Sequence, residues 1–234
     1  MEKKVQLLTV GNPKTLKGQG LRYLTAILHL APHRLSGVMN ACPYATEGCI
    51  GGCLNKAGRG GIFRKGEDTN AIQKARIART RWLAADRAGF LAQLHKEIKA
   101  HVRRAYRAEM VPAIRPNGTS DIAWERVAPE LFDRWNLVRW YDYTKGAHRL
   151  GQTPPNYSLT LSRSESNEAE CLRALANGHN VAAVFAGDLP ATHHGFPVIN
   201  ADEHDLRFLD PRGVWCGLRA KGPARRDASG FVIR

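Results

Sequence analysis

The sequence of 234 residues lacks any apolar run of about 18 residues, the length that a transmembrane helix needs. It also lacks internal repeats and low-complexity segments, and its first residues do not contain the apolar core of a signal peptide. A chain of this length forms one large domain or at most two small ones. We therefore expect a single domain over residues 1–234 that stays in the cytoplasm and does not bind membranes.

Acidic residues are scarce relative to basic ones, with 21 Asp and Glu against 35 Lys and Arg, so the formal net charge is +14. This excess favours an anionic partner such as nucleic acid. Much of it lies between Lys74 and Arg107 and between Arg219 and Arg234. A solvated basic helix face explains the first segment equally well. Few aromatic residues interrupt it, so a platform for stacking bases is poorly supported.

Several catalytic signatures are missing, namely a nucleophile elbow, a P-loop and the glycine pattern of dinucleotide-binding folds. The catalytic residues therefore stay unassigned. Cysteines are few and odd in number, at five. In a reducing compartment this count favours metal ligation or free thiols over disulfides.

Three of the five cysteines fall in one stretch, Asn40 to Gly60, with the spacing C-x6-C-x3-C. The stretch is rich in glycine and poor in large apolar side chains, so burial alone cannot hold it in place. We interpret residues 35–66 as a loop that folds around a metal or an iron–sulfur cluster. Its expected ligands are Cys42, Cys49 and Cys53.

The nature of the bound group is open among three hypotheses. A 4Fe-4S cluster is held by thiolates, and three cysteines would leave one iron open to another ligand. Structural zinc needs four ligands, which His29 or His33 would complete. The third hypothesis is a loop of free thiols. We expect Cys171 and Cys216 to be core residues, with Cys216 as an alternative distant fourth ligand.

The order of elements predicts an α/β fold. Buried strands alternate with polar loops and helices, which is typical of a parallel sheet with helical crossovers. We expect a TIM-like (β/α) barrel, partial rather than complete, with the cysteine loop after an early strand. The expected strands are 5–9, 23–30, 110–115, 137–143, 157–161, 180–186, 198–199 and 214–218, and the expected helices are 71–107, capped by Asp68 or Thr69 and divided near Gly89, 122–135, interrupted at Pro129, and 167–177.

Polar residues gather in the loops that follow these strands, where parallel sheets place their functional groups. We expect a cavity above the cluster, lined by Arg115, Asn117, Asp121, Asp142, Lys145, Ser162 and Ser164. The stretch 117–121 also fits a plain Asx turn with a helix cap, and the pair at 142 and 145 also fits a structural role.

A second polar group is formed by His193, His194, Asp202, His204 and Asp205. These residue types resemble a site for a hard metal ion. Their spacing matches no helical pair of histidine ligands, and a polar surface loop is the favoured interpretation.

Motifs along the chain resemble those of the gene product 88 family of phage proteins. They are HLAP (29–32), CPYATEGC (42–49), CLNKAGRG (53–60), RPNGTSDIAWE (115–125), YDYTK (141–145), LTLSRSESN (159–167) and GLRAKG (217–222). The resemblance implies the cytoplasm of a phage host. More distantly, the chain is similar to radical S-adenosylmethionine enzymes, which place a three-cysteine loop after the first strand of a partial barrel. Their cysteine spacing, C-x3-C-x2-C, differs from the one found here.

Two functions follow as hypotheses. The first is an iron–sulfur protein, with a 4Fe-4S cluster whose open iron binds a small molecule, S-adenosylmethionine among the candidates, for redox or radical chemistry. A cluster without catalytic turnover is equally consistent with the sequence. The alternative is a basic nucleic-acid-binding protein in which zinc ties a structural knot.

Overall fold

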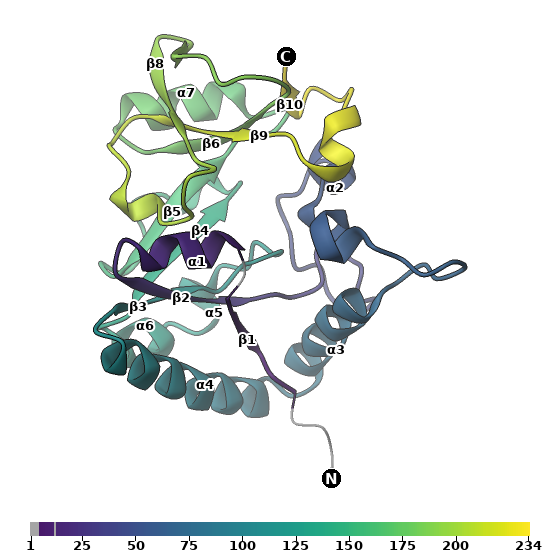
Figure 1. Cartoon of the computed structure of the whole chain (residues 1–234), viewed down its shortest axis with the longest axis vertical. Coiled ribbons are helices and arrows are strands. Elements are labelled where there is room, and N and C mark those ends of the chain that lie inside the picture. The colour runs from purple at the N-terminus through teal and green to yellow at the C-terminus, as the bar shows by residue number, and fades with distance from the viewer. Residues whose placement is uncertain (1–4, 12) are drawn as a thin grey trace.

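One ten-stranded sheet organises the fold in the computed structural model, which describes residues 5–11 and 13–234 (Figure 1). The strands lie in the order β1-β2-β3-β4-β5-β6-β9-β8-β7, and β10 pairs with β6. The strands are β1 (Leu8–Val10), β2 (Tyr23–Leu28), β3 (Val111–Arg115), β4 (Arg139–Thr144), β5 (Tyr157–Ser162), β6 (Val181–Phe185), β7 (Thr192–His193), β8 (Phe196–Asn200), β9 (Trp215–Arg219) and β10 (Val232–Ile233). The expected absence of a signal peptide and the expected loop after the first strand fall partly on residues 1–4 and 12, outside the described residues.

The α/β class is confirmed, and the barrel is open. Strands β2-β3-β4-β5-β6-β9 run parallel and lie in chain order, as the strands of a (β/α) barrel do. In the described part of the chain, however, the sheet does not close into a TIM barrel. Antiparallel β1 extends one edge, and parallel β8 with antiparallel β7 extends the other.

The helices match the expected pattern in the middle of the chain and differ from it elsewhere. They are α1 (Pro13–Gln19), α2 (Glu47–Gly51), α3 (Ala71–Ala85), α4 (Arg87–Arg107), α5 (Trp124–Val127), α6 (Glu130–Arg134) and α7 (Glu168–Ala176). Helix α1 lies where we expected a loop. The expected helix 122–135 is two short helices, because Pro129 starts a new one.

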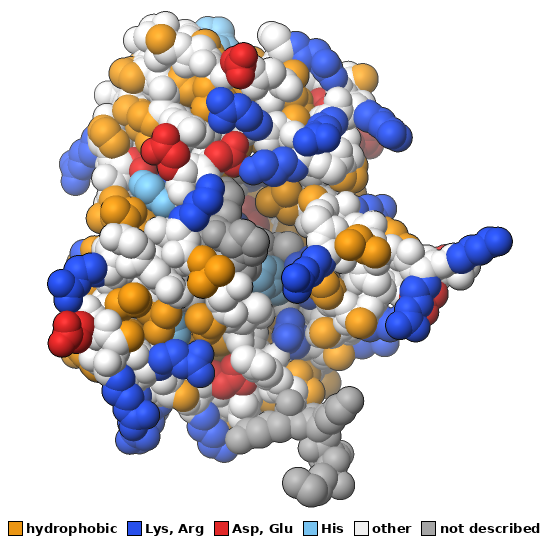
Figure 2. Space-filling model, in the orientation of Figure 1, with side chains coloured by type: hydrophobic (Ala, Val, Ile, Leu, Met, Phe, Trp, Pro, Cys, Tyr) orange, Lys and Arg blue, Asp and Glu red, His pale blue; other side chains and the backbone are white. Residues whose placement is uncertain are grey.

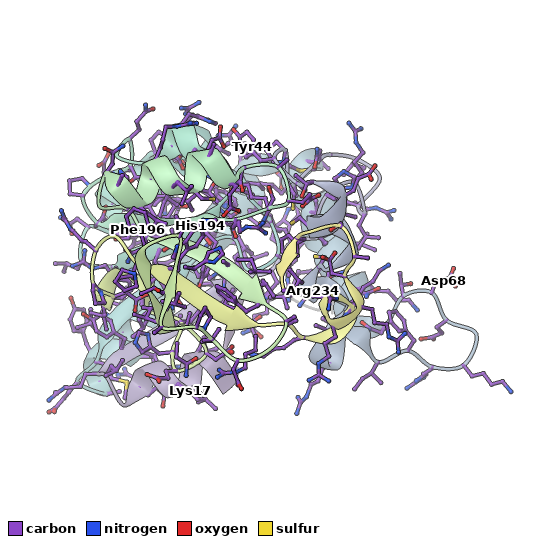
Figure 3. All side chains as sticks on the ribbon, turned by 90° about the horizontal axis from the view of Figure 1, so that it is seen from above. Lys17, Tyr44, Asp68, His194, Phe196 and Arg234 are labelled. Atoms are coloured by element: carbon purple, nitrogen blue, oxygen red, sulfur yellow. The ribbon has the colours of Figure 1, made fainter. Side chains whose placement is uncertain are left out.

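The long basic helix is divided near Gly89, as expected, and its caps explain both starts. Asp86 accepts a hydrogen bond from the Gly89 amide, which begins α4. The expected cap of α3 at Asp68 or Thr69 is wrong, because Asn70 accepts the bond from the Gln73 amide. Asp68 lies instead on a loop that projects from the body of the molecule (Figure 3).

Helices cover the outer face of the sheet. Helix α4 packs Phe90, Leu94 and Ile98 into the core cluster that contains Leu28 and Ile114 of the neighbouring strands. Helix α7 buries Cys171, Ala174 and Leu175 against Val181, Ala183 and Phe185 of β6 and against Trp215 of β9. Cys171 is therefore a core residue, as expected.

The inner face is covered by chain rather than by helices. Ala182 and Cys216 point to this side and pack with Ala201 and Val214. Leu206, in the segment after β8, packs on Ala113 of β3 and Tyr141 of β4. This segment covers part of the inner face, and its Asp202 and Asp205 reach the carboxyl ends of the strands. Cys216 is a core residue too.

Among the described residues, none of the helices has both the length and the apolar character needed to cross a membrane.

Candidate metal centre and ligand cavity

A cavity of about 570 Å³ lies at the carboxyl ends of the parallel strands. This volume is in the range of small-molecule and cofactor sites. One wall is the cysteine loop, with Cys42, Cys49 and Cys53, and the other walls come from residues at or after the ends of β2, β3, β4, β5 and β9. The cavity therefore lies between two parts of the chain that the sequence predicted to meet.

The cysteine loop is anchored to the sheet by one carboxylate, Glu165. Thr46 caps helix α2, and its hydroxyl donates to Glu165 Oε2 at 2.8 Å. The Gly48 amide donates to Glu165 Oε1 at 2.9 Å. These bonds lower the pKa of Glu165, although its burial alone would raise it, so the anchor is ionised at neutral pH. The loop after β5 thereby fixes the start of the helix that carries Cys49.

Gly48 has a steric reason to be glycine. A Cβ atom there would lie 2.2 Å from Ser229 Oγ and 2.8 Å from both Glu165 Oε2 and Phe231 Cβ. The carboxyl-terminal tail thus packs directly on the backbone of α2, as the neighbouring chains at the upper right of Figure 1 show. At this position the glycine of the motif lets the side chains of Glu165, Ser229 and Phe231 approach the backbone of α2 closely.

All three thiols line the cavity, and two of them accept hydrogen bonds from backbone amides. Cys42 Sγ accepts a hydrogen bond from the His33 amide at 3.2 Å, and Cys53 Sγ accepts one from the Asn55 amide at 3.5 Å. Burial raises the pKa of Cys42 to about 12 and also raises the pKa of Cys53. A bound cation reverses this, because a coordinating thiol loses its proton.

The spacing of the sulfur atoms bears on which metal they would hold. Ligand atoms of one zinc ion lie about 3 to 4 Å apart, given bond lengths of about 2.0 to 2.3 Å and tetrahedral geometry. The described residues contain one group of three metal-ligating side chains whose atoms all lie within 4.8 Å, and it does not include the cysteines. As they stand, the three thiols are not gathered within ligand distance of one ion.

The wall at β3 and β4 is built around Asp205, which reaches it from the segment after β8. Its carboxylate accepts from Arg115 Nη1 at 3.0 Å and from the hydroxyls of Tyr141 and Tyr143, each at 3.2 Å. The Arg115 guanidinium lies over the Tyr143 ring, 4.6 Å from its centre. Arg115 is thus held rigidly at the cavity edge.

Asp142 stands behind this wall rather than in it. Its Oδ2 accepts from Asn117 Nδ2 at 2.8 Å and from the Tyr157 hydroxyl at 3.2 Å. Its Oδ1 lies 3.5 Å from Arg115 Nε. Burial raises the pKa of Asp142 to about 7, against the opposing effect of Arg115.

The Asn117 side chain makes hydrogen bonds within its own loop and to Asp142 of β4. Its carbonyl oxygen accepts from the Ile122 amide and from the Ser120 hydroxyl, and its amide group donates to the Ile122 carbonyl as well as to Asp142. Next to it, a Cβ atom at Gly118 would lie 2.6 Å from the ring of His29. This part of the motif therefore shapes the wall.

Asp121 is likewise engaged by neighbouring groups. It accepts from the Lys145 amide at 2.8 Å and pairs with Arg149 Nη1 at 2.7 Å. Arg149 is itself fully buried and binds Glu125 through two hydrogen bonds. The carboxylate of Asp121 thus fixes the start of the loop that carries the Lys145 side chain.

Two cations at the cavity have no carboxylate partner among the ion pairs of the described residues, Arg76 and Lys145. Arg76 donates to Asn55 at 2.5 Å, and its Nε has no hydrogen-bond partner in the described structure. Both cations are close enough to Cys53 to act on its pKa in the lowering direction, although burial dominates. The cysteine side of the cavity is therefore electropositive.

His29 completes this side as a neutral ring. Burial, and then the positive charges of Arg76, Arg115 and Arg79, lower its pKa to about 3. A neutral imidazole at the cavity wall is a ligand or hydrogen-bonding group rather than a further cation.

Of the residues predicted to line the cavity, Arg115, Asn117, Asp121, Lys145 and Ser162 do so, and Asp142 and Ser164 do not. The Ser164 amide instead donates to Asn167 in the turn before α7. The prediction overlooked the cations Arg76, Arg163, Arg219 and Lys221. Arg163 directly follows β5, Arg219 is the last residue of β9 and Lys221 lies two residues beyond it, so the rule that found Arg115 and Lys145 would also have found them.

The fold and the cavity define an α/β protein whose open parallel sheet carries a cysteine-lined, electropositive cavity at its carboxyl edge. The chain belongs to the gene product 88 family, whose model matches residues 6–234. The family resemblance read from the motifs is thereby confirmed. Searches of the curated proteins and of the solved structures found no match.

Proposed function

We propose that this protein binds an iron–sulfur cluster of the 4Fe-4S type through Cys42, Cys49 and Cys53. The observation that carries the proposal is that three thiols, none of them part of a hydrophobic core cluster of the described residues, line one wall of a cavity at the carboxyl edge of a parallel sheet. Three thiolate ligands leave one iron open, and here that iron would face the cavity.

The charges around the thiols support the same proposal. A cluster with its sulfides and three thiolates is anionic, and Arg76 and Lys145 supply positive charge without carboxylate partners of their own. The amides that donate to Cys42 and Cys53 are the kind of second-shell bonds that tune such clusters. An empty cavity would leave two partly buried cations poorly compensated.

The open iron and the cavity volume favour redox or radical chemistry on a small anionic molecule. Arg115 and Lys145, which are rigidly placed, would orient its acidic group. The consecutive parallel strands and the loop after β2 support the likeness to radical S-adenosylmethionine enzymes, while the cysteine spacing does not. S-adenosylmethionine, whose carboxylate would bind these cations, is thus one candidate ligand. We place this activity in the cytoplasm of a phage host.

The test is anaerobic purification or reconstitution, followed by absorbance spectra and iron and sulfide analysis. We expect a brown protein with several irons per chain, and loss of iron in the variant Cys42→Ala/Cys49→Ala/Cys53→Ala. Cys171→Ala is the matched control, because that thiol is in the core, and it should retain the iron. A colourless wild type, or iron retained in the triple variant, would overturn the proposal.

A second experiment concerns the open iron. The electron paramagnetic resonance spectrum of the reduced cluster should change when a ligand of the open iron is added, with S-adenosylmethionine as the first probe. A changed spectrum that reverts in Lys145→Gln would support an anionic ligand held at the cavity. An unchanged spectrum would reject S-adenosylmethionine and leave the cluster itself as measured in the first experiment.

Nucleic-acid binding remains the second candidate, favoured by the outer surface of α4. Its exposed residues include Lys96, Lys99, Arg103, Arg104 and Arg107. Figure 2, however, shows Lys and Arg spread over the visible face rather than gathered in one patch. Replacing three of these residues by Gln should abolish binding if α4 follows phosphates, and should leave the iron content unchanged.

A further inference from the structure

A tight hairpin brings two adjacent histidines to the end of helix α7. Strands β7 and β8 are joined by two residues, His194 and Gly195, with φ angles of 49° and 80°. Two positive φ angles define the type I′ turn, which glycine adopts freely and a non-glycine residue less readily. The turn places the His194 side chain beside α7, as Figure 3 shows.

The helix contributes a carboxylate to the same place. Glu168, the first residue of α7, has its Oε1 3.0 Å from His194 Nε2 and 3.7 Å from His193 Nε2. All three ligand atoms lie within 4.8 Å of one another, and within the described residues no other such trio occurs. Donor atoms on one zinc-type ion lie about 3.3 Å apart, so only small side-chain movements are needed.

Two of these atoms are buried without hydrogen-bond partners. Glu168 Oε1 and His193 Nε2 are both shielded from solvent and lack a partner of good geometry in the described structure. Buried polar atoms of this kind are rare and need an explanation. Here the two atoms lie 3.7 Å apart, and a cation beside them would bind both.

The remaining contacts hold the trio in place. The His193 ring lies edge-on to Phe185 and Trp215, with ring centres 5.6 and 5.0 Å away. Trp215 Nε1 donates to the His193 carbonyl oxygen at 2.8 Å. Glu168 Oε2 accepts from Arg163 Nε, which leaves Oε1 for the ion. Such second-shell bonds are typical of metal ligands.

We propose that Glu168, His193 and His194 bind a divalent transition-metal ion of the zinc type. Two imidazoles and one carboxylate suit zinc and its neighbours in the first transition series, and three protein ligands leave a position for water or substrate. The site is separate from the cysteine loop and does not depend on the proposed cluster. Its ion would tie the β7–β8 hairpin to α7.

The five polar residues whose types resemble a hard-metal site in the sequence are thereby divided. His193 and His194 meet Glu168, whereas Asp205 binds Arg115, and Asp202 binds Lys221 at 2.5 Å. His204 lies against Arg207. The second half of this group is thus engaged in ion pairs and hydrogen bonds elsewhere.

The test uses Co²⁺ as the probe, because its spectrum separates the two kinds of site. Thiolate ligands give an intense charge-transfer band, and nitrogen and oxygen ligands give weaker bands in the visible region. We expect the wild type to bind one Co²⁺ without the thiolate band, and Zn²⁺ to displace it. Glu168→Gln and His194→Asn should each weaken this binding by about 100-fold or more, and Arg163→Gln by about 10-fold to 100-fold.

The matched control is His179→Asn, which removes a histidine outside the trio and should leave Co²⁺ binding unchanged. His194 is about half exposed, so its replacement spares the core and tests the site even if Glu168→Gln misfolds. Equal Co²⁺ affinity in His194→Asn and wild type would overturn the proposal. So would a thiolate band as the sole sign of binding. Neither result would bear on the iron content.

Discussion

Helix α4 and residues 42–61 of the cysteine loop are similar in length, but different forces hold them in place. Helix α4, with 21 residues, buries Phe90, Leu94, Ile98, His101 and Ala105 against the sheet. In residues 42–61 the buried positions are Gly48, Asn55 and Gly60, and two of these have no side chain. The larger apolar residues of this loop lie outward, with Leu54 58% exposed. The loop has no core of its own.

Hydrogen bonds replace apolar burial in the loop. Beside the Glu165 anchor, the Asn70 amide group donates to the carbonyls of Gly60 and Ile62, and Gln73 donates to Gly60. Each such bond contributes about 1 kcal/mol, less than one large buried apolar side chain. The comparison indicates that α4 is held by apolar burial, whereas the loop is held by hydrogen bonds to the side chains of Glu165, Asn70 and Gln73.

The largest expected effect on stability comes from a substitution in helix α4. Phe90→Ala should lower the free energy of unfolding by about 3–5 kcal/mol, because it empties a fully buried ring site. Urea denaturation of the cluster-free protein measures this loss. The same loss should appear in the cluster-loaded protein, and a loss that disappears on loading would contradict the separation of the two regions.

Removal of the anchor should act mainly on the loop. Glu165→Ala removes two hydrogen bonds to a carboxylate and should cost about 2–3 kcal/mol. Limited proteolysis should then cut within residues 42–61 faster than in the wild type, while α4 stays protected. Glu170→Ala, on the exposed side of α7, is the control and should not change the cleavage rate.

The pH dependence should report on the cavity through His29. Its pKa in the folded protein is about 3, against 6.5 as the ordinary value, so the unfolded chain binds the proton more readily. The stability that this neutral ring provides is present above pH 6.5 and is lost as the pH falls. At pH 5 the loss should be about 2 kcal/mol.

Denaturation at pH 7 and pH 5 measures this loss of stability, and His29→Gln should abolish it. An anionic cluster would offset the nearby arginine charges, so the loss should be smaller in the loaded protein. An identical pH profile in wild type and His29→Gln would show that His29 does not titrate in this way.

The smallest effect concerns the cysteines themselves. In the cluster-free protein, Cys42→Ala should change the free energy of unfolding by less than about 1 kcal/mol, because the side chain is half-buried and small. In the loaded protein the same change should cost more, since it removes a ligand. Thermal denaturation with and without reconstitution compares the two states. Equal costs in both would mean that the thiol only packs.

Local patterns predicted the parts of the fold that depend on local physics. The split of the long helix followed from Asp86 and Gly89, and the cavity position followed from the rule for parallel strand ends. That rule predicts where a cavity lies. It does not predict which polar side chains there lack hydrogen-bond partners within the protein. Asn117 and Asp121 proved to be engaged in building the wall, which a sequence without its contacts cannot reveal.

The pairings that the sequence did not predict join residues far apart in the chain. Asp205 joins Arg115 from 90 positions away, and Glu168 meets His193 across a strand and a loop. Neither pairing has a spacing signal, because the sheet order brings the residues together. The two-residue strands β7 and β10 also escaped prediction, since so short a strand leaves no pattern.

Arg163 contacts both candidate sites, the cavity and the group of Glu168 and the two histidines. It lines the cavity, binds Glu168 through Nε, and donates from Nη1 to the carbonyls of Gly230 and Phe231 in the tail. A cation bound at Glu168 Oε1 would share this carboxylate with Arg163 on Oε2, draw off part of its negative charge and so make the cavity more positive. Linkage requires reciprocity, so an anion in the cavity would raise the affinity of the histidine pair for its ion by the same factor. One guanidinium would thus let two separate sites sense each other's occupancy.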